Sequence, residues 1–213
     1  MVYLIVMSMP QPESALETPS TTPWRSAVFV FVLCGIYALL RYSFFGPVEP
    51  QHWPTYISNK AISVFAVCML ALSGWNYAKG YTLRSKQQGR MVWHAALIHS
   101  GLSLALLNGD YYPKFFADNG MNFLGESVIL CGVLASYALW QVGNLCGLRH
   151  HQFKCLACAL ALLHLLPMSA SWITPMQWYG FMPPMSLISA LAAGTALLLY
   201  WRYRQPDQSN QKT

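Results

Sequence analysis

Two of the six histidines, His99 and His164, lie deep within long apolar segments, where ionisable side chains are costly and therefore indicate function. His99 precedes Asn108 by nine residues and His164 precedes Trp172 by eight, near the ends of two segments expected to run in the same direction. At a helical rise of about 1.5 Å per residue, both imidazoles should lie about 12–14 Å below one membrane face. Two imidazoles at one depth on different helices are what bis-histidine ligation of a haem iron requires, because each ligand approaches one face of the ring.

The neighbours of both histidines leave space for a flat group. Small residues share the helical face of each histidine: Ala95, Ala96 and Ser103 for His99, and Ala157 and Ala161 for His164. The alternative is that each imidazole only forms a hydrogen bond between helices.

The other histidines are less informative. His151 precedes His164 by thirteen residues, or about 20 Å along a helix, which suits two stacked haems. His150 and His151 could equally be solvated loop residues beside Arg149. His94 is five residues from His99 and points away from it, which favours a packing or interfacial role.

Composition identifies the elements that must position these side chains. The chain has 213 residues, of which 55% are hydrophobic and only 9% charged, against roughly 25% charged in soluble domains. Its apolar blocks are about 18–24 residues long, enough to cross a bilayer as helices. We therefore predict an all-α polytopic membrane protein with six transmembrane helices in one bundle. The expected spans are 26–45, 56–78, 89–108, 122–145, 152–173 and 183–201.

The cations predict the orientation of these spans. Ten Lys and Arg residues fall on one side, and Arg41, Lys60 and Lys114 on the other, so the first side is expected to be cytoplasmic. The net charge of +6 thus reports topology, not a nucleic-acid partner. We expect a disordered cytoplasmic tail over 1–23, the membrane domain over 24–203 and a cytoplasmic tail over 204–213. The apolar start is too short, and lacks a positive leader, for a signal peptide.

The fourth span carries small residues on one face. They are Gly125, Gly132, Ser136 and Gly143, which superpose within about 40° on a helical wheel. Close packing against another helix and room for a flat cofactor are both consistent with this face.

Several motifs resemble the ferric reductase-like transmembrane domain family, and most closely the haem-binding membrane subunits of periplasmic methionine sulfoxide reductase systems. The resemblance covers about residues 50–195. Its motifs are His151-x12-His164, Trp93-His-Ala-Ala-Leu-Ile-His99, Asn59-Lys-Ala-Ile-Ser-Val-Phe-Ala, Tyr111-Tyr-Pro-Lys-Phe-Phe and Pro183-Pro-Met-Ser-Leu.

The resemblance implies a b-type cytochrome that moves electrons across a membrane. His99 and His164 match the ligands of the outer haem, and His151 matches an inner ligand. The inner partner is missing, because Ser85 and Lys86 stand where the family has a histidine. One haem b is therefore expected, and the second is left open.

If the outer haem is oriented as in the family, its propionates face the external side. Arg41 and Lys60 would then be their cations. The alternative is that both side chains snorkel to the headgroups or pair with Glu126.

The implied role is electron transfer from quinol or a cytoplasmic flavin reductase toward an external redox acceptor protein, as one component of an oxidoreductase in a bacterial inner membrane. One alternative is a haem-free accessory subunit, scaffold or small transporter. A quinone-linked disulfide-forming enzyme is disfavoured, because Cys155 and Cys158 form a Cys-x-x-Cys pair at the cytoplasmic end, where thiols stay reduced. We expect free core thiols there.

Overall fold

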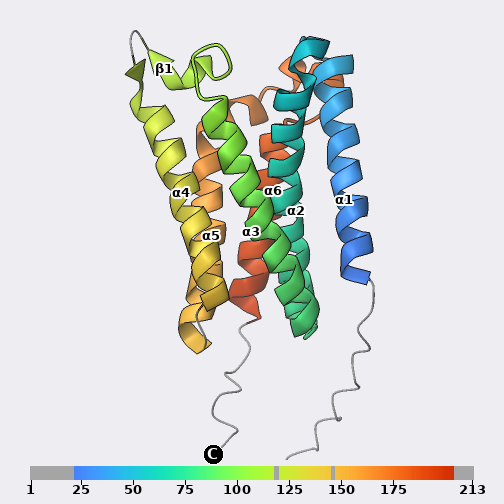
Figure 1. Ribbon diagram of the computed structural model, residues 1–213, viewed down its shortest axis with the longest axis vertical. Helices are drawn as coiled ribbons and strands as arrows, with labels where there is room; N and C mark the ends of the chain where they lie inside the picture. Colours follow the sequence, from blue (N-terminus) through green and yellow to red (C-terminus); the bar gives the residue numbers. More distant parts are fainter. Residues whose placement is uncertain (1–21, 118–119, 145–146, 204–213) are drawn as a thin grey trace, which may run out of the picture.

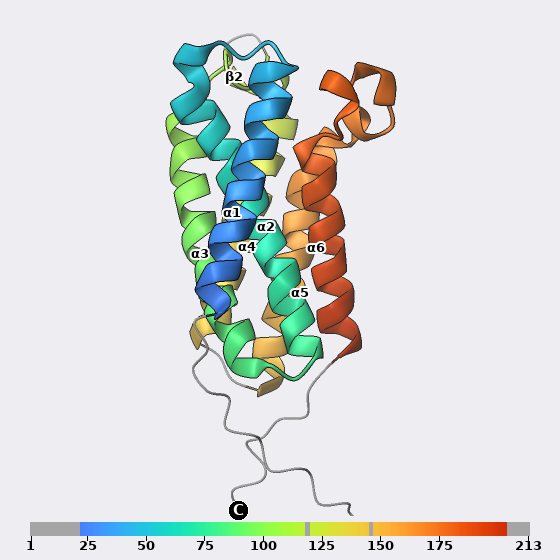
Figure 2. The same ribbon diagram turned by 90° about the vertical axis from the view of Figure 1, so that its right-hand side faces the viewer.

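The computed structural model describes residues 22–117, 120–144 and 147–203, which form an almost entirely helical structure (Figure 1). The six long helices are α1 (Thr22–Leu39), α2 (Ser58–Ala78), α3 (Thr82–Ala105), α4 (Phe123–Asn144), α5 (Gly147–Leu165) and α6 (Met185–Arg202). They lie side by side along one direction (Figures 1 and 2). The predicted tail 204–213 and residues 1–21 of the predicted N-terminal tail lie outside the described residues.

Shorter elements connect the helices. Two π-helical turns, Leu40–Phe44 and Trp53–Ile57, extend α1 and precede α2. The short 3₁₀ turns are Pro50–His52, Pro113–Phe115, Leu166–Trp172, Pro175–Gln177 and Tyr179–Phe181. Strands β1 (Phe116–Ala117) and β2 (Gly120–Met121) form an antiparallel hairpin.

Five of the helical segments are long and apolar enough to cross a membrane. They are Trp24–Phe44, Pro50–Ala78, Phe123–Asn144, Arg149–Trp172 and Tyr179–Arg202. The third helix does not meet this measure and begins seven residues before the predicted span at 89. Its first turns are polar and contain Arg84, Lys86, Gln87, Gln88 and Arg90. These residues have a high helix propensity but are unfavourable in the hydrocarbon core of a bilayer.

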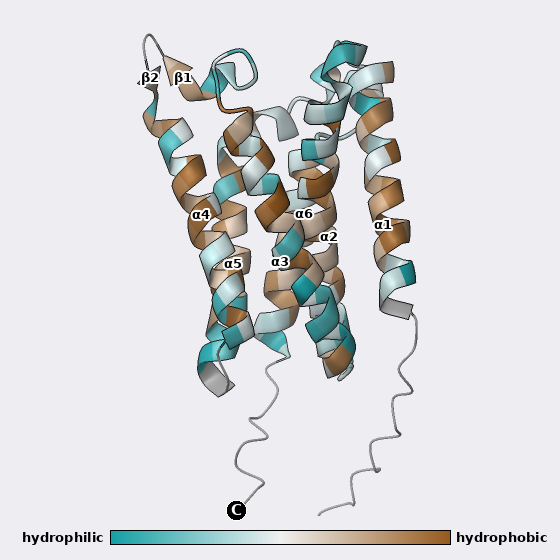
Figure 3. Ribbon diagram, viewed as in Figure 1, coloured by the Kyte–Doolittle hydropathy of each residue, from teal (hydrophilic) through white to brown (hydrophobic). Residues whose placement is uncertain are grey.

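We call the end that carries β1 and β2 the hairpin end, and the opposite end, where α1 begins and α6 finishes, the terminal end (Figure 1). The described cations divide between them as the sequence predicts. Those toward the terminal end are Arg25, Lys79, Arg84, Lys86, Arg90, Arg149, Lys154 and Arg202. Arg41, Lys60 and Lys114 lie at the hairpin end. Hydropathy along the ribbons shows apolar stretches over much of the helices' length (Figure 3).

Helices α2 and α5 make most of the contacts between helices. Helix α2 contacts α1, α3 and α6, while α5 contacts α4 and α6. Helix α1 packs mainly on α2 and exposes apolar side chains, including Phe29, Val32 and Ile36, on its other faces. Exposed apolar faces of this kind suit contact with lipid.

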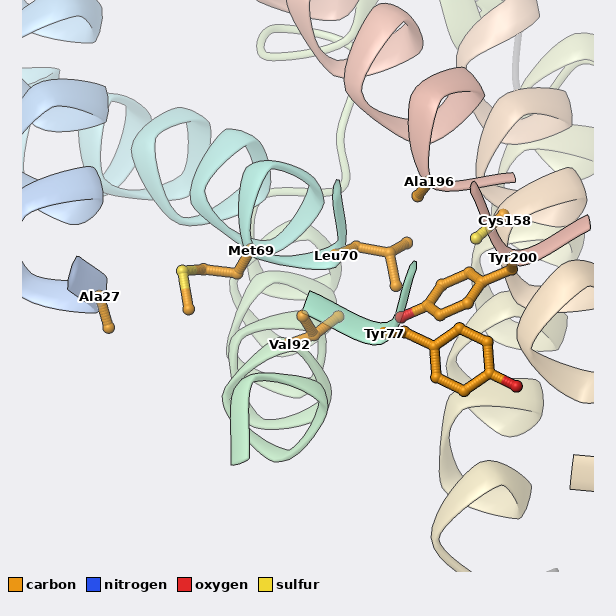
Figure 4. Close-up of a cluster of buried hydrophobic side chains, with 8 residues drawn as sticks. All are labelled: Ala27, Met69, Leu70, Tyr77, Val92, Cys158, Ala196 and Tyr200. Atoms are coloured by element: carbon orange, nitrogen blue, oxygen red, sulfur yellow. The ribbon is translucent and has the colours of Figure 1, made fainter. Parts of the chain in front are cut away.

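The terminal half of the structure is filled by a core that we call the terminal-half core. Its members are Ala27, Met69, Leu70, Tyr77, Val92, Cys158, Ala196 and Tyr200 (Figure 4). The rings of Tyr77 and Tyr200 lie 5.5 Å apart between centroids. Tyr200 is 2% exposed, and its hydroxyl donates to Ser73 Oγ at 2.9 Å. Ser73 in turn donates to the Ser85 carbonyl, so this half is both packed and hydrogen-bonded.

Candidate functional site

A cavity of about 260 Å³ lies in the half of the structure toward the hairpin end. Helices α2 to α6 contribute its walls, and Leu70 and Val92 of the terminal-half core belong to its lining. The wall is mostly apolar, with serine hydroxyls, Tyr112, Lys60 and the two deep histidines as its main polar groups. The hollow region therefore coincides with the residues singled out for chemistry.

The structure brings His99 of α3 and His164 of α5 together across this cavity. Their ring centroids are 6.4 Å apart and the ring planes are nearly perpendicular, at 86°. Both residues line the cavity, with Ala96 and Ser103 beside His99 and Ala157 and Ala161 beside His164. Four of the five small residues predicted to leave space thus line the cavity, whereas Ala95 is buried and is not part of the cavity wall.

The hydrogen bonds of both imidazoles assign the same tautomer. His99 Nδ1 lies 2.6 Å from the side-chain oxygen of Asn59, and His164 Nδ1 lies 2.8 Å from the backbone carbonyl of Val128. A carbonyl oxygen can only accept, so each Nδ1 carries the proton. Each Nε2 is left with a lone pair on the opposite side of the ring, which is the form in which imidazole binds a metal.

The Asn59 amide nitrogen has partners of its own. Its Nδ2 donates to the Tyr112 hydroxyl at 3.0 Å and to Ser103 Oγ at 3.2 Å. Because these two bonds use the amide hydrogens, the oxygen is directed to His99. Asn59 is 2% exposed, and it joins α2, α3 and the loop that follows α3.

Glycine at position 132 allows His164 to approach α4. A Cβ placed there would lie only 3.1 Å from His164 Nδ1. Of the other small residues on that face, Gly125 packs against Phe115, whereas Ser136 lines the cavity and Gly143 faces open space. The face therefore packs closely at Gly125 and Gly132 and lines the cavity at Gly132 and Ser136.

Arg41 and Lys60, the cations considered for the propionates, and Glu126, their alternative partner, differ in their relation to the cavity. Lys60 lines the cavity, with its Nζ 5.3 Å from the Tyr56 ring centroid and 5.7 Å from that of Tyr112. Glu126 is exposed and is not part of the cavity wall.

Arg41 is used elsewhere in the fold. It is 5% exposed, donates to the Met182 carbonyl and lies within 5.5 Å of the ring centroids of Tyr42 and Tyr179. Its guanidinium joins the end of the first span to the loop before α6 and is not part of the cavity wall.

His151 is not part of the cavity wall; its Nε2 lies 3.9 Å from Cys155 Sγ on the next turn. Ser85, one of the two residues considered at the position of an inner haem ligand, is buried against Ser73.

Two further histidines contact backbone carbonyls, and the described cysteines form no disulfide. His94 is exposed and contacts the Arg90 carbonyl, and His150 contacts the Val142 carbonyl. The cysteines among the described residues are free thiols: Cys34, Cys68, Cys131, Cys155 and Cys158.

Sequence reasoning missed the groups that hold the two histidines. Asn59 offered a signal, because a buried amide within an apolar span needs partners. Val128 offered none, because its contribution is a backbone carbonyl that any residue type supplies.

Among the described residues, no three His, Cys, Asp or Glu side chains are grouped to hold a metal ion. The sequence matches no family model and no curated protein. The resemblance to the ferric reductase-like family therefore stays a hypothesis based on the motifs quoted above.

Proposed function

We propose that the protein is a b-type haem electron carrier of the membrane, in which His99 and His164 hold one haem iron from opposite faces. The observation that carries this proposal is the pair of imidazoles in the cavity, with ring centroids 6.4 Å apart and each Nδ1 bonded to a carbonyl oxygen. Both rings are thereby oriented before any ligand arrives.

The spacing of the two rings fits a shared metal. A metal–nitrogen bond is about 2 Å long, and the ring nitrogen lies about 1 Å from the centre of the imidazole. Two imidazoles on one metal thus have centroids about 6 Å apart, against the 6.4 Å found here. Two protein ligands alone are too few for a structural metal ion, but they suffice for haem iron, whose other four ligands belong to the macrocycle.

The charge of the cavity also suits haem. Lys60 brings an ammonium group into a largely apolar cavity, and an anionic group nearby would offset the cost of its burial. A propionate is such a group, and Lys60 lies toward the hairpin end, where the resemblance places the propionates. Held by the imidazoles of His99 and His164, a haem would supply one-electron outer-sphere transfer.

The wider assignment follows from the same proposal. All six helices would span the membrane in one bundle, with α3 carrying its polar first turns into the headgroup region and beyond. The cation-rich terminal end would be cytoplasmic and the hairpin end external. In a bacterial inner membrane, electrons from quinol or a cytoplasmic flavin reductase would then pass to an external redox acceptor protein.

The test is a reduced-minus-oxidised spectrum of the purified protein with haem quantified per chain. We expect low-spin b-type bands and one firmly bound equivalent, with any second haem below one equivalent and dependent on His151. Protein that contains no haem after expression with adequate haem supply, and binds none on titration, would show that the histidines only join helices.

A further inference from the structure

We infer that Asn59 is a positioning residue that sets the redox potential of the iron through His99, and that Tyr112 holds Asn59 in the orientation that does so. This inference rests on the proposed haem function. It concerns a side chain that touches neither iron nor macrocycle but bonds to one of the two ligands.

The first step is the bond between Asn59 and His99. At 2.6 Å it is shorter than most hydrogen bonds between neutral groups. An acceptor on Nδ1–H draws the proton away from the ring and makes Nε2 a stronger electron donor. A stronger donor favours the oxidised iron and so lowers the midpoint potential.

The second step is the anchoring of the amide. If Asn59 turned its NH₂ group toward His99, the Nδ1 proton would face another donor. In the orientation found, the Tyr112 hydroxyl and Ser103 Oγ accept from Nδ2. Turning the amide would break both bonds unless each hydroxyl donated instead, so these two partners oppose the turn. Burial raises the pKa of the Tyr112 hydroxyl above its usual range, so the phenol stays neutral and remains a partner over the physiological pH range.

The third step is the asymmetry between the two ligands. His164 bonds to the Val128 carbonyl, which no substitution of a side chain removes. His99 bonds to a side chain from another helix. The potential can therefore be changed at Asn59 without altering either iron ligand.

The chain provides a matched control. Asn76 lies on the same helix as Asn59 and also bonds across to α3, where its Nδ2 donates to Gln88 Oε1 at 2.7 Å. This second amide bridge lies in the terminal half, away from the histidines. An Asn→Leu change at either position removes one amide hydrogen bond between α2 and α3. Only the change at Asn59 also removes the hydrogen-bond acceptor of His99 Nδ1.

The experiment is a redox titration, with an electron paramagnetic resonance spectrum of the oxidised protein, on the haem-loaded parent, Asn59→Leu, Asn59→Asp, Tyr112→Phe and Asn76→Leu. Asn59→Leu should raise the midpoint potential and Asn59→Asp should lower it. We expect about a tenfold change in the ratio of reduced to oxidised iron at fixed ambient potential, or about 59 mV for one electron. Tyr112→Phe should shift it in the direction of Asn59→Leu by less, and Asn76→Leu should leave it unchanged.

Parent-like potentials and spectra in haem-loaded Asn59→Leu and Asn59→Asp would overturn the inference, as would an equal shift in Asn76→Leu. If Asn59→Leu loses its haem, Asn59→Asp decides, because it keeps an acceptor at the same place. A parent without haem would instead overturn the proposed function, so the two failures are distinguishable.

Discussion

The two halves of this protein use the same six helices differently. Toward the hairpin end, α2 to α6 surround a cavity lined by two neighbouring imidazoles and a lysine. Toward the terminal end, the same helices close on Tyr77 and Tyr200, with Ser73 and Ser85 bonded among them. Large aromatic residues fill one half, whereas alanine, glycine and serine leave the other hollow. Side-chain volume at a few positions thus decides which half can hold a ligand.

The largest effect should come from the imidazoles of the hollow half. His99→Ala or His164→Ala leaves a single axial ligand, and each should lower bound haem by at least about tenfold. Haem per protein after purification measures this. His94→Ala, on the exposed face of α3, is the control and should retain the parent content. A full low-spin spectrum in both ligand variants would contradict the assignment.

The packed half should govern stability without affecting the haem. Tyr200→Ala removes a ring that is 2% exposed and should lower the free energy of unfolding by about 3–5 kcal/mol. Tyr200→Phe removes only the hydroxyl bonded to Ser73 and should cost about 1 kcal/mol. Thermal unfolding in detergent gives the ranking, and the spectrum of folded protein should not change. A haem signal lost in Tyr200→Phe would mean that the two halves are coupled.

A smaller effect is expected at the contact between α4 and His164. Gly132→Val places methyl groups against His164, because even a Cβ there would lie 3.1 Å from Nδ1. Overpacking of this kind costs about 1–3 kcal/mol, which should appear as weaker haem binding in a titration. Gly143→Val makes the same change on the same helix, where nothing lies within 4 Å, and serves as the control. Equal affinities for the two variants would indicate that His164 is free to move.

The smallest effect is electrostatic. Lys60→Gln removes a positive charge from the cavity wall. The free energy of reducing the iron should then become less favourable by on the order of 1 kcal/mol, so the midpoint potential should fall. Arg41→Gln removes the same charge from a group that bonds the Met182 carbonyl outside the cavity wall, and should mainly lower thermal stability. An unchanged potential in Lys60→Gln, with haem intact, would favour snorkelling of that lysine to the headgroups.

The pairing of His99 with His164 could be predicted because helices rise uniformly, so positions counted from the span ends give depth. The start of α3 could not be predicted in this way, because hydropathy detects the part that suits lipid and misses the polar turns before it. The placement of Arg41 also escaped prediction. Its partner is a backbone carbonyl more than a hundred residues away. Every residue has such a carbonyl, so the residue types do not indicate this contact.

The hydrogen bonds of the two histidines also bear on how the protein is assembled in the membrane. Asn59 and His99 belong to the consecutive helices α2 and α3, and Val128 and His164 to the consecutive helices α4 and α5. Each helical hairpin therefore contains one imidazole together with the group that orients it. Insertion of either hairpin completes half of the site, and lateral association of the two hairpins brings the halves face to face. Each histidine could therefore form its orienting hydrogen bond before the two hairpins associate.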